Sequence, residues 1–298
     1  MTGQAIPDGF DYQGDVYRPP GEADSILIQA TVGCSHNICT FCSGHLGKRF
    51  AVKDEKILDQ DLLFAEHYCK RQDRVFVIDG NALTMPMRRW EWLLENIRTR
   101  LPWVTGVGCF GTAMDIAAKS DEDLRRLRGL GLDRLYMGVE SGLPEVLARV
   151  RKGIEPEGVL AQGRRAKAAG MELQVSLIIG IVNEGQSLDH ARATGGILSA
   201  MDPDVVTVLT LVPQPGTAMR EELDKGELVP PGPPGLLREL RELLVHTSLN
   251  GGLFDCGHST GYLPFKARLP EEKQKGLDHI DAALAGEIPL KPDARRRI

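Results

Sequence analysis

Three of the chain's six cysteines lie within nine residues, at Cys34, Cys39 and Cys42 of the stretch GCSHNICTFCS. Thiolates crowded into one loop are typical of a metal site, because zinc and iron–sulfur clusters both take sulfur ligands. Three thiolates leave one position to be filled from elsewhere. The spacing therefore predicts a metal centre with one open position.

The fourth ligand decides between two kinds of centre. A structural zinc site is closed by four ligands, which here would require Cys69, His36 or His45. A [4Fe–4S] cluster can be held by three thiolates, with its fourth iron open to an external ligand. Phe41, directly before the last cysteine, would place an aromatic ring beside that iron. The loop favours the iron–sulfur cluster and leaves zinc as the alternative.

Composition and charge describe a soluble protein with a substantial core. Hydrophobic residues make up 42% of the 298 residues and charged residues 26%. The formal net charge of -5 argues against a dedicated nucleic-acid binder. We see neither a signal peptide nor an apolar run that could span a bilayer, and we expect a cytoplasmic location. In that reducing compartment, clustered cysteines are metal-binding or catalytic.

Strands and helices alternate along most of the chain and must position the cysteine loop. We predict strands over residues 25–32, 74–79, 104–110, 134–139, 171–181 and 205–211, and helices over 55–71, 87–99, 120–130, 143–151, 156–169 and 186–200. Apolar strands separated by helices indicate a parallel sheet covered by helices. Six such units make either a partial barrel or an open doubly wound sheet. The cysteine loop follows the first strand.

A proline-rich stretch, LVPPGPPG at residues 228–235, marks a change in composition. It is followed by a predicted helix over 236–249, the turn NGGLFDCGHSTGY and a last helix over 270–285. We expect a disordered tail from about residue 288. The predicted organisation is an N-terminal arm over 1–24, a barrel over 25–227, and C-terminal helices and a lid over 228–298.

Several stretches together resemble one family. The cysteine loop, VFVIDGNALTMP, LYMGVESGLPEVLARVRKG and YLPFKARLPEEK are similar to a subset of the radical S-adenosylmethionine (SAM) superfamily with a C-x4-C-x2-C loop. The resemblance implies a partial (β/α)6 TIM-like barrel with a C-terminal extension, a [4Fe–4S] cluster and SAM as cofactors. It further implies reductive cleavage of SAM to a 5′-deoxyadenosyl radical, with electrons from a low-potential donor such as ferredoxin or flavodoxin.

The resemblance also implies a role for the end of the second strand, Asp79-Gly80-Asn81. This position matches the family's glycine-rich stretch, whose backbone and acidic group hold the methionine amine of SAM. An Asp-Gly-Asp form is commoner in related chains, so Asn81 departs from the pattern. From the residues alone, Asp-Gly-Asn is also strong turn chemistry.

The fourth strand ends in GVESG, which resembles the family's ribose-contacting segment. Glu140 and Ser141 are the candidate contacts there. Among the basic residues that follow, Arg151 is our candidate for the methionine carboxylate, and Arg149 and Lys152 are alternatives. A helix with an exposed basic face is the plain interpretation.

The fifth and sixth strands end in LIIGIVNE and LTLVPQPGT. These resemble the segments that frame adenine, with Gly180 allowing close approach, Glu184 just beyond it, and Val212 beside the ring. Each motif is weak alone, and their order at consecutive strand ends is the stronger signal.

Three further residues are candidates for the catalytic step. Cys109 ends the third strand and would face the same cavity, although a buried inert cysteine is the alternative. Cys256 and His258 lie in a glycine-rich turn that could cover the barrel mouth or be a surface loop.

The resemblance thus implies a radical SAM enzyme, and we expect its radical to abstract hydrogen from a small organic substrate. Transfer of a methyl, methylthio or aminocarboxypropyl group is one alternative. A non-catalytic haem or iron–sulfur binding protein is the other.

Overall fold

The computed structural model describes residues 6–296, which divide into two compact units. The first contains residues 6–37, 44–136 and 165–172, and the second contains residues 38–43, 137–164 and 173–296. Strand β6 (Leu132–Glu140) begins in the first unit and ends in the second. The cysteine loop is divided as well, with Cys34 in the first unit and Cys39 and Cys42 in the second.

In the first unit the strand order is β1-β4-β5-β6, and β4 pairs in parallel with both β1 and β5. A separate small hairpin joins β2 to β3. The elements are β1 (Ile26–Gln29), β2 (Thr31–Val32), β3 (Ala51–Val52), α1 (Glu55–Tyr68), β4 (Arg74–Ile78), α2 (Met87–Arg100), β5 (Gly106–Gly111), α3 (Ala113–Ala117) and α4 (Asp121–Gly129). Short 3₁₀ turns cover Pro20–Glu22 and Ala82–Thr84.

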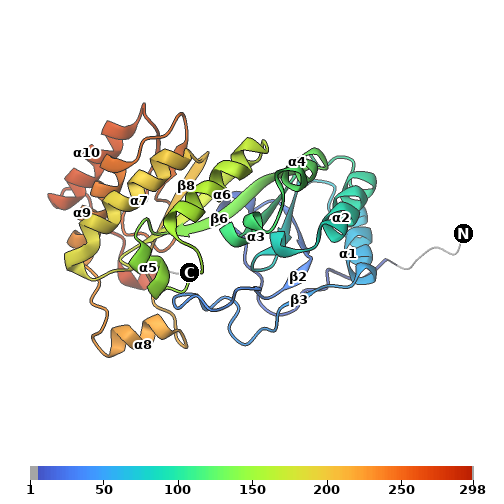
Figure 1. Cartoon of the computed structure of the whole chain (residues 1–298), viewed down its shortest axis with the longest axis horizontal. Coiled ribbons are helices and arrows are strands. Elements are labelled where there is room, and N and C mark those ends of the chain that lie inside the picture. The colour runs from blue at the N-terminus through green and yellow to red at the C-terminus, as the bar shows by residue number, and fades with distance from the viewer. Residues whose placement is uncertain (1–5, 297–298) are drawn as a thin grey trace, which may run out of the picture. The chain divides into compact units, whose positions relative to one another are not determined.

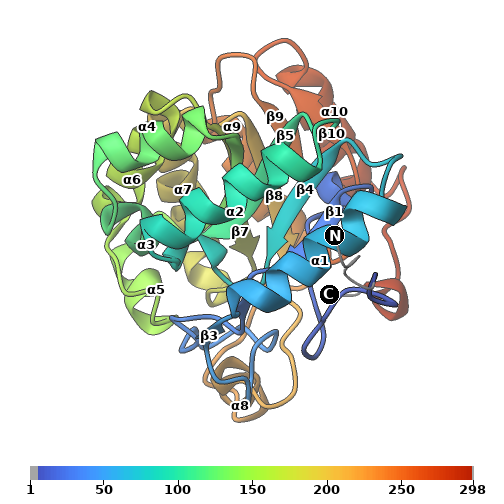
Figure 2. The same ribbon diagram turned by 90° about the vertical axis from the view of Figure 1, so that its right-hand side faces the viewer.

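Local sequence signals explain where these helices begin. Asp54 accepts a hydrogen bond from the Lys56 N–H at the start of α1, and Ser120 forms a capping box with Asp123 at the start of α4. Helices α1 and α2 lie side by side against the strands (Figure 2). The opposite face of the sheet carries an aromatic cluster of Phe76, Phe110 and Tyr136. Both faces of these strands are therefore covered, as in a parallel sheet.

In the second unit the strand order is β6-β7-β8-β9-β10. Strand β8 pairs in parallel with β7 and β9, and β10 pairs antiparallel with β9. The elements that lie wholly or mostly in this unit are α5 (Pro144–Arg149), α6 (Pro156–Ala168), β7 (Glu172–Ile179), α7 (Ser187–Met201), β8 (Val205–Thr210), α8 (Ala218–Asp224), α9 (Pro233–His246), β9 (Leu253–Asp255), β10 (Lys266–Arg268) and α10 (Lys273–Leu284). Helix α9 packs between α7 and α10 (Figure 1).

The strand order settles the fold class. Strands β1, β4, β5, β6, β7 and β8 follow one another in space in the order of the chain, whereas a doubly wound sheet reverses its order at a switch point. The α/β fold is therefore a TIM-like partial barrel, and the order of the described strands does not close on itself.

The structure differs from the sequence prediction in three places. The strand predicted over 25–32 breaks at Ala30, and Thr31–Val32 pairs instead with β3. The sequence analysis did not predict helices α3 and α8 or strands β9 and β10. These elements are too short to show the hydrophobic periodicity of a helix or a strand. The described part of the tail, predicted to be disordered, forms a 3₁₀ turn at Asp293–Arg295.

Candidate functional site

The first cysteine is positioned by the loop after β4, within the first unit. Gly33 has a φ of 74°, in the region that favours glycine, and its N–H donates to Asp79 Oδ2 at 3.1 Å. Gly80 packs so closely that an added Cβ would lie 2.7 Å from the Cα and Cβ of Cys34. Only glycine fits at position 80, and the backbone there lies directly against the first cysteine.

Asp79 anchors this loop. Its side chain is 1% exposed and lies near two basic groups, with His45 Nδ1 at 3.4 Å and Lys48 Nζ at 3.5 Å. The first distance is long for a hydrogen bond. Burial lowers the pKa of His45, against the opposing effect of the Asp79 charge. The Asp79 carboxylate thus contacts the Gly33 N–H and the nearby basic groups, and the group that lies directly beside Cys34 is the Gly80 backbone.

The other two cysteines are positioned by backbone contacts within the second unit. The Thr40 N–H donates to the Val150 carbonyl at 3.2 Å, and the Met219 N–H donates to the Thr40 carbonyl at 3.0 Å. Phe41 packs against a cluster that includes Val182 at the end of the β7 segment. The aromatic residue of the loop therefore packs against an apolar core, and it is partly exposed like Cys39 and Cys42.

The chemistry of these donors fits an iron–sulfur cluster. None of the six cysteines forms a disulfide, and Cys34, Cys39 and Cys42 are the ones that are partly exposed. Cys69 is buried at the end of α1, where its carbonyl accepts from Trp103. Within residues 6–296, no group of three or more His, Cys, Asp or Glu side chains is arranged to hold a metal ion. Ligation by the three cysteines therefore stays a prediction from the sequence.

At the end of β6, Glu140 forms a buried ion pair. Its carboxylate lies 2.7 Å from Lys152 Nζ, and both side chains are 8% exposed. Gly138 makes room for the pair, since a Cβ there would lie 2.1 Å from Glu140 Oε1. Glu140 has a φ of 61° and Arg151 a φ of 55°. Arg151 is exposed, so the buried cation at this strand end is Lys152.

The side chains of Ser141 and Arg149, next to this pair, both bond to other groups of the protein. Ser141 is fully buried, and its hydroxyl accepts from the Leu143 N–H at 3.0 Å. Arg149 pairs with Glu222 at 2.5 Å. Both residues shape the turn into α5 and the contact with α8.

A buried carboxylate supports the end of β7. The N–H of Gly180, whose φ is 74°, donates to both oxygens of Glu239 at 3.2 Å. His190 Nδ1 lies 2.9 Å from Glu239 Oε1, and both side chains are fully buried. Because a carboxylate only accepts, Nδ1 carries the proton. Glu184 is exposed beyond this point, and the Val212 carbonyl accepts from Gln214.

The two remaining candidate cysteines are buried, Cys109 within β5 and Cys256 directly after β9. Cys109 alternates with Phe110, which belongs to the aromatic cluster, so the thiol points to the opposite face from the one expected. Burial raises the pKa of Cys109, and nearby Asp115 adds to this. Burial likewise raises the pKa of Cys256. Thiols protonated in this way are poor nucleophiles and poor ligands.

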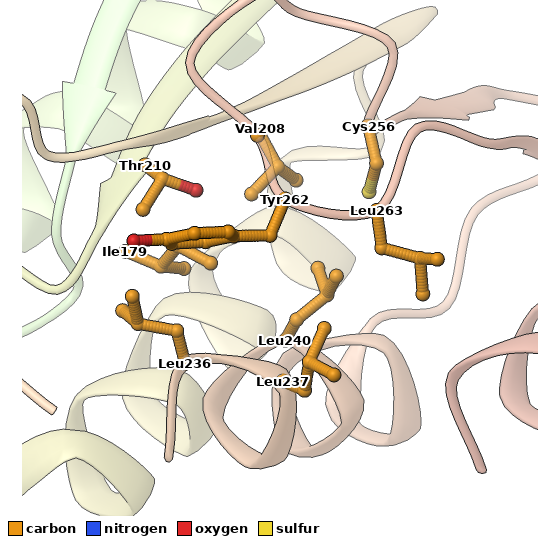
Figure 3. Close-up of a pocket in the computed structure, with 10 residues that line it drawn as sticks. Ile179, Val208, Thr210, Leu236, Leu237, Leu240, Cys256, Tyr262 and Leu263 are labelled. Carbon is orange, nitrogen blue, oxygen red and sulfur yellow. The ribbon is translucent and has the colours of Figure 1, made fainter. Parts of the chain in front are cut away.

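Cys256 lines a small pocket with apolar side chains of α9 (Figure 3). The pocket has a volume of about 10 Å³, enough for roughly one water molecule. Tyr262 lies across it, between the ends of β7 and β8 and the leucines of the helix. The pocket is too small to hold a substrate.

His258 is tied to the end of β8 through Thr260. The Thr260 hydroxyl accepts from the Thr210 N–H at 3.0 Å and lies 2.9 Å from His258 Nδ1. The Thr260 N–H also points at Nδ1, so the hydroxyl donates there and Nε2 carries the imidazole proton. Burial and nearby Lys291 lower the pKa of His258. A neutral imidazole results.

Two residues that the sequence analysis did not name support the candidate site. Asp115, in α3, contacts Asn81, and Glu239 holds Gly180. Each left a signal in the sequence. Thr112 lies three residues before Asp115, the spacing of a capping box, and Glu239 lies on the apolar face of α9 among leucines.

Comparisons with known proteins agree with this architecture. Curated relatives include the "Uncharacterized methyltransferase PH0819" of Pyrococcus horikoshii, 26% identical over 70% of this chain and 43% of that protein. Another is the "Heme chaperone HemW" of Bacillus subtilis, 22% identical over 66% of this chain and 53% of that one. The chain thus spans about half the length of the curated relatives it matches. In the described part, no helix is long and apolar enough to cross a membrane.

Among solved structures, coproporphyrinogen III oxidase (HemN) of Escherichia coli shares the fold with a TM-score of 0.55 at 18% identity, over 74% of this chain and 51% of that one. The family model of the radical SAM superfamily matches residues 28–193, more than half of the chain. Its members use a [4Fe–4S] cluster and SAM. This chain belongs to the radical SAM superfamily.

Proposed function

We propose that the chain is a radical SAM enzyme that abstracts a hydrogen atom from a small organic substrate. Cys34, Cys39 and Cys42 would hold the [4Fe–4S] cluster. That cluster would supply the electron for reductive cleavage of SAM to methionine and a 5′-deoxyadenosyl radical. The observation that carries the proposal is the close approach of Gly80 to Cys34, which leaves backbone rather than side chain beside the first ligand.

The protein's own groups would bind and orient SAM. The Gly80 backbone lies beside Cys34, where the methionine end would bind, and Glu140 with Lys152 offers one negative and one positive group at the end of β6. Gly180 and Val212 would frame adenine from the ends of β7 and β8. An electron donor of low potential, such as ferredoxin or flavodoxin, would reduce the cluster.

Methyl transfer is the second candidate, because one relative is named as a methyltransferase. A cysteine that accepts the methyl group would have to be reactive. Cys109 and Cys256 are both buried with raised pKa values, so neither suits that role. This observation favours hydrogen abstraction over a route through a methylated cysteine.

Anaerobic incubation of the reconstituted protein with dithionite and SAM tests the proposal. We expect 5′-deoxyadenosine and methionine in equal amounts, with deuterium entering 5′-deoxyadenosine from a labelled substrate. S-adenosylhomocysteine without 5′-deoxyadenosine would indicate methyl transfer. An intact cluster with no cleavage would support a haem or iron–sulfur binding protein and overturn the proposal.

Substitution of the loop cysteines tests the ligand assignment. Cys34→Ala, Cys39→Ala and Cys42→Ala should each remove iron and the brown colour. Cys69→Ala is the matched control, because that thiol is buried at the end of α1, and it should keep both. Zinc retained in a colourless wild-type protein would contradict the iron–sulfur assignment.

A further inference from the structure

Asn81 connects the loop of the first cysteine to the end of the next strand. Its Oδ1 accepts from the Ser35 N–H at 2.8 Å, and its Nδ2 donates to Ser35 Oγ at 2.8 Å. The same Nδ2 donates to Asp115 Oδ1 at 3.1 Å and to Oδ2 at 2.9 Å. The side chain is 1% exposed, so water does not compete for these contacts.

Asp115 is itself fixed in place. Its Oδ2 accepts from the Thr112 N–H at 2.7 Å and from the Thr112 hydroxyl at 2.8 Å, which closes the capping box of α3. Asp115 is 6% exposed. A rigid path of hydrogen bonds therefore runs from the end of β5 through Asp115 and Asn81 to Ser35, the residue after Cys34.

We propose that Asn81 is a positioning residue for the cysteine loop, and that an amide is required there because it must donate to Asp115 while accepting from the Ser35 backbone. A carboxylate at position 81 would place an oxygen 2.9 and 3.1 Å from the two Asp115 oxygens, where the amide nitrogen now lies. Two buried carboxylates at that separation repel each other strongly. The inference rests on the proposed role of Cys34 as a cluster ligand.

The structure suggests a reciprocal test. Asn81→Asp creates the carboxylate pair, whereas Asn81→Asp combined with Asp115→Asn restores one donor facing one acceptor. In the double variant, the amide oxygen of residue 115 takes the place of Oδ2 and still accepts from Thr112, and its nitrogen donates across the 3.1 Å contact. The 2.9 Å contact then joins a carboxylate oxygen to an uncharged amide oxygen, so the repulsion between two charges is removed. Asn250→Asp is the matched control, since Asn250 donates to Asp202 at 3.0 Å in an exposed turn of the second unit.

Two measurements on these variants report on the loop without enzymatic turnover. The first is the rate at which an iron chelator removes iron from anaerobically reconstituted protein. Groups that orient metal ligands typically contribute 10- to 100-fold to metal affinity, so we expect Asn81→Asp to lose iron about 10- to 100-fold faster. The second is the rate of alkylation of Cys34 in cluster-free protein, which should rise. The double variant should return toward wild type in both, and Asn250→Asp should match wild type.

The outcomes separate this inference from the proposed function. Iron retention and Cys34 alkylation at wild-type rates in Asn81→Asp would overturn the positioning role alone. The same holds if the double variant unfolds at the wild-type temperature yet loses iron as fast as the single variant. A wild-type protein that takes up no iron would overturn the proposed function, and with it the ligand that Asn81 is inferred to position.

Discussion

The buried pair of Glu140 and Lys152 leads to a prediction whose size follows from the structure. Both side chains are 8% exposed, and their charged atoms are 2.7 Å apart. Lys152→Met keeps the length and the apolar stem of the lysine but leaves the Glu140 carboxylate buried without a counter-charge. Removing one partner of a buried pair typically costs about 3–5 kcal/mol, because the remaining charge is poorly solvated.

The size of this effect can be isolated with a double-mutant cycle. Glu140→Gln combined with Lys152→Met removes both charges and should cost less than Lys152→Met alone. Arg220→Met is the matched control, because Arg220 and Asp224 lie 2.8 Å apart, close to the 2.7 Å of the buried pair, but are 44% and 53% exposed. That exposed pair should contribute far less to stability than the buried pair, because solvent screens its charges.

Urea unfolding of the cluster-free protein, followed by far-ultraviolet circular dichroism, measures these costs. Tryptophan fluorescence is unsuitable, since Trp90, Trp92 and Trp103 all lie in the first unit and the pair lies in the second. A loss for Lys152→Met no larger than that for Arg220→Met would refute the reasoning. If Glu140 also contacts SAM, the double variant should regain stability without regaining SAM affinity.

Three further predictions concern buried groups. Glu239→Gln removes an acceptor from a fully buried site and should lower the free energy of unfolding by about 1–3 kcal/mol in urea titrations. Burial raises the pKa of Asp61 to about 6 from its ordinary 3.8, so the folded state holds a proton that the unfolded state releases. Stability should therefore fall as pH rises between about 4 and 6, and Asp61→Asn should flatten this slope in unfolding midpoints. Arg296→Ala removes hydrogen bonds to Thr260 and Tyr262 and should speed limited proteolysis near Tyr262, whereas Arg295→Ala should not. Equal cleavage of the two variants would contradict the inference that Arg296 holds the C-terminal residues against the Thr260–Tyr262 turn.

The βα rhythm could be predicted from the sequence because each long strand and helix carries its own signal. Runs such as RVFVI have the apolar pattern of a buried strand, and Ser120 with Asp123 marks a helix start. The strand over 25–32 was predicted too long because its apolar run continues past Ala30, where the backbone turns to meet β3. The strand ends there because Thr31 and Val32 pair with Val52 and Ala51, which are distant in the sequence. The apolar pattern of residues 25–32 alone does not indicate that pairing.

The sequence indicated where in the fold the candidate site residues lie, but not which other residues they contact. The motif order assigned Asp79, Glu140 and Gly180 to the ends of the second, fourth and fifth predicted strands, and each lies at or just beyond the end of its strand. Of the two interpretations of Cys109, its complete burial favours the buried inert cysteine over a catalytic thiol, since strand alternation places the thiol on the face opposite Phe110. Arg151 as the contact of the methionine carboxylate stays a prediction; in the structure Arg151 is exposed and the neighbouring Lys152 is buried, a difference that a run of basic residues does not indicate.

The acidic residues that lie at or contact these strand ends share one property that bears on how SAM would bind. Asp79 binds the Gly33 N–H, Glu140 binds Lys152 and Glu239 binds the Gly180 N–H, so each carboxylate is already neutralised or hydrogen-bonded by the protein. A buried charge satisfied in this way holds the neighbouring backbone rigid. We therefore expect SAM to contact mainly the backbone of Gly80 and Gly180. The carboxylates of Asp79 and Glu239 would hold that backbone in place without contacting SAM themselves. Conservative amide substitutions of Asp79 and Glu239 should then weaken SAM binding by loosening these loops, and higher thiol or protease accessibility should accompany the loss. A loss of affinity with unchanged accessibility would show instead that the carboxylates contact the ligand directly.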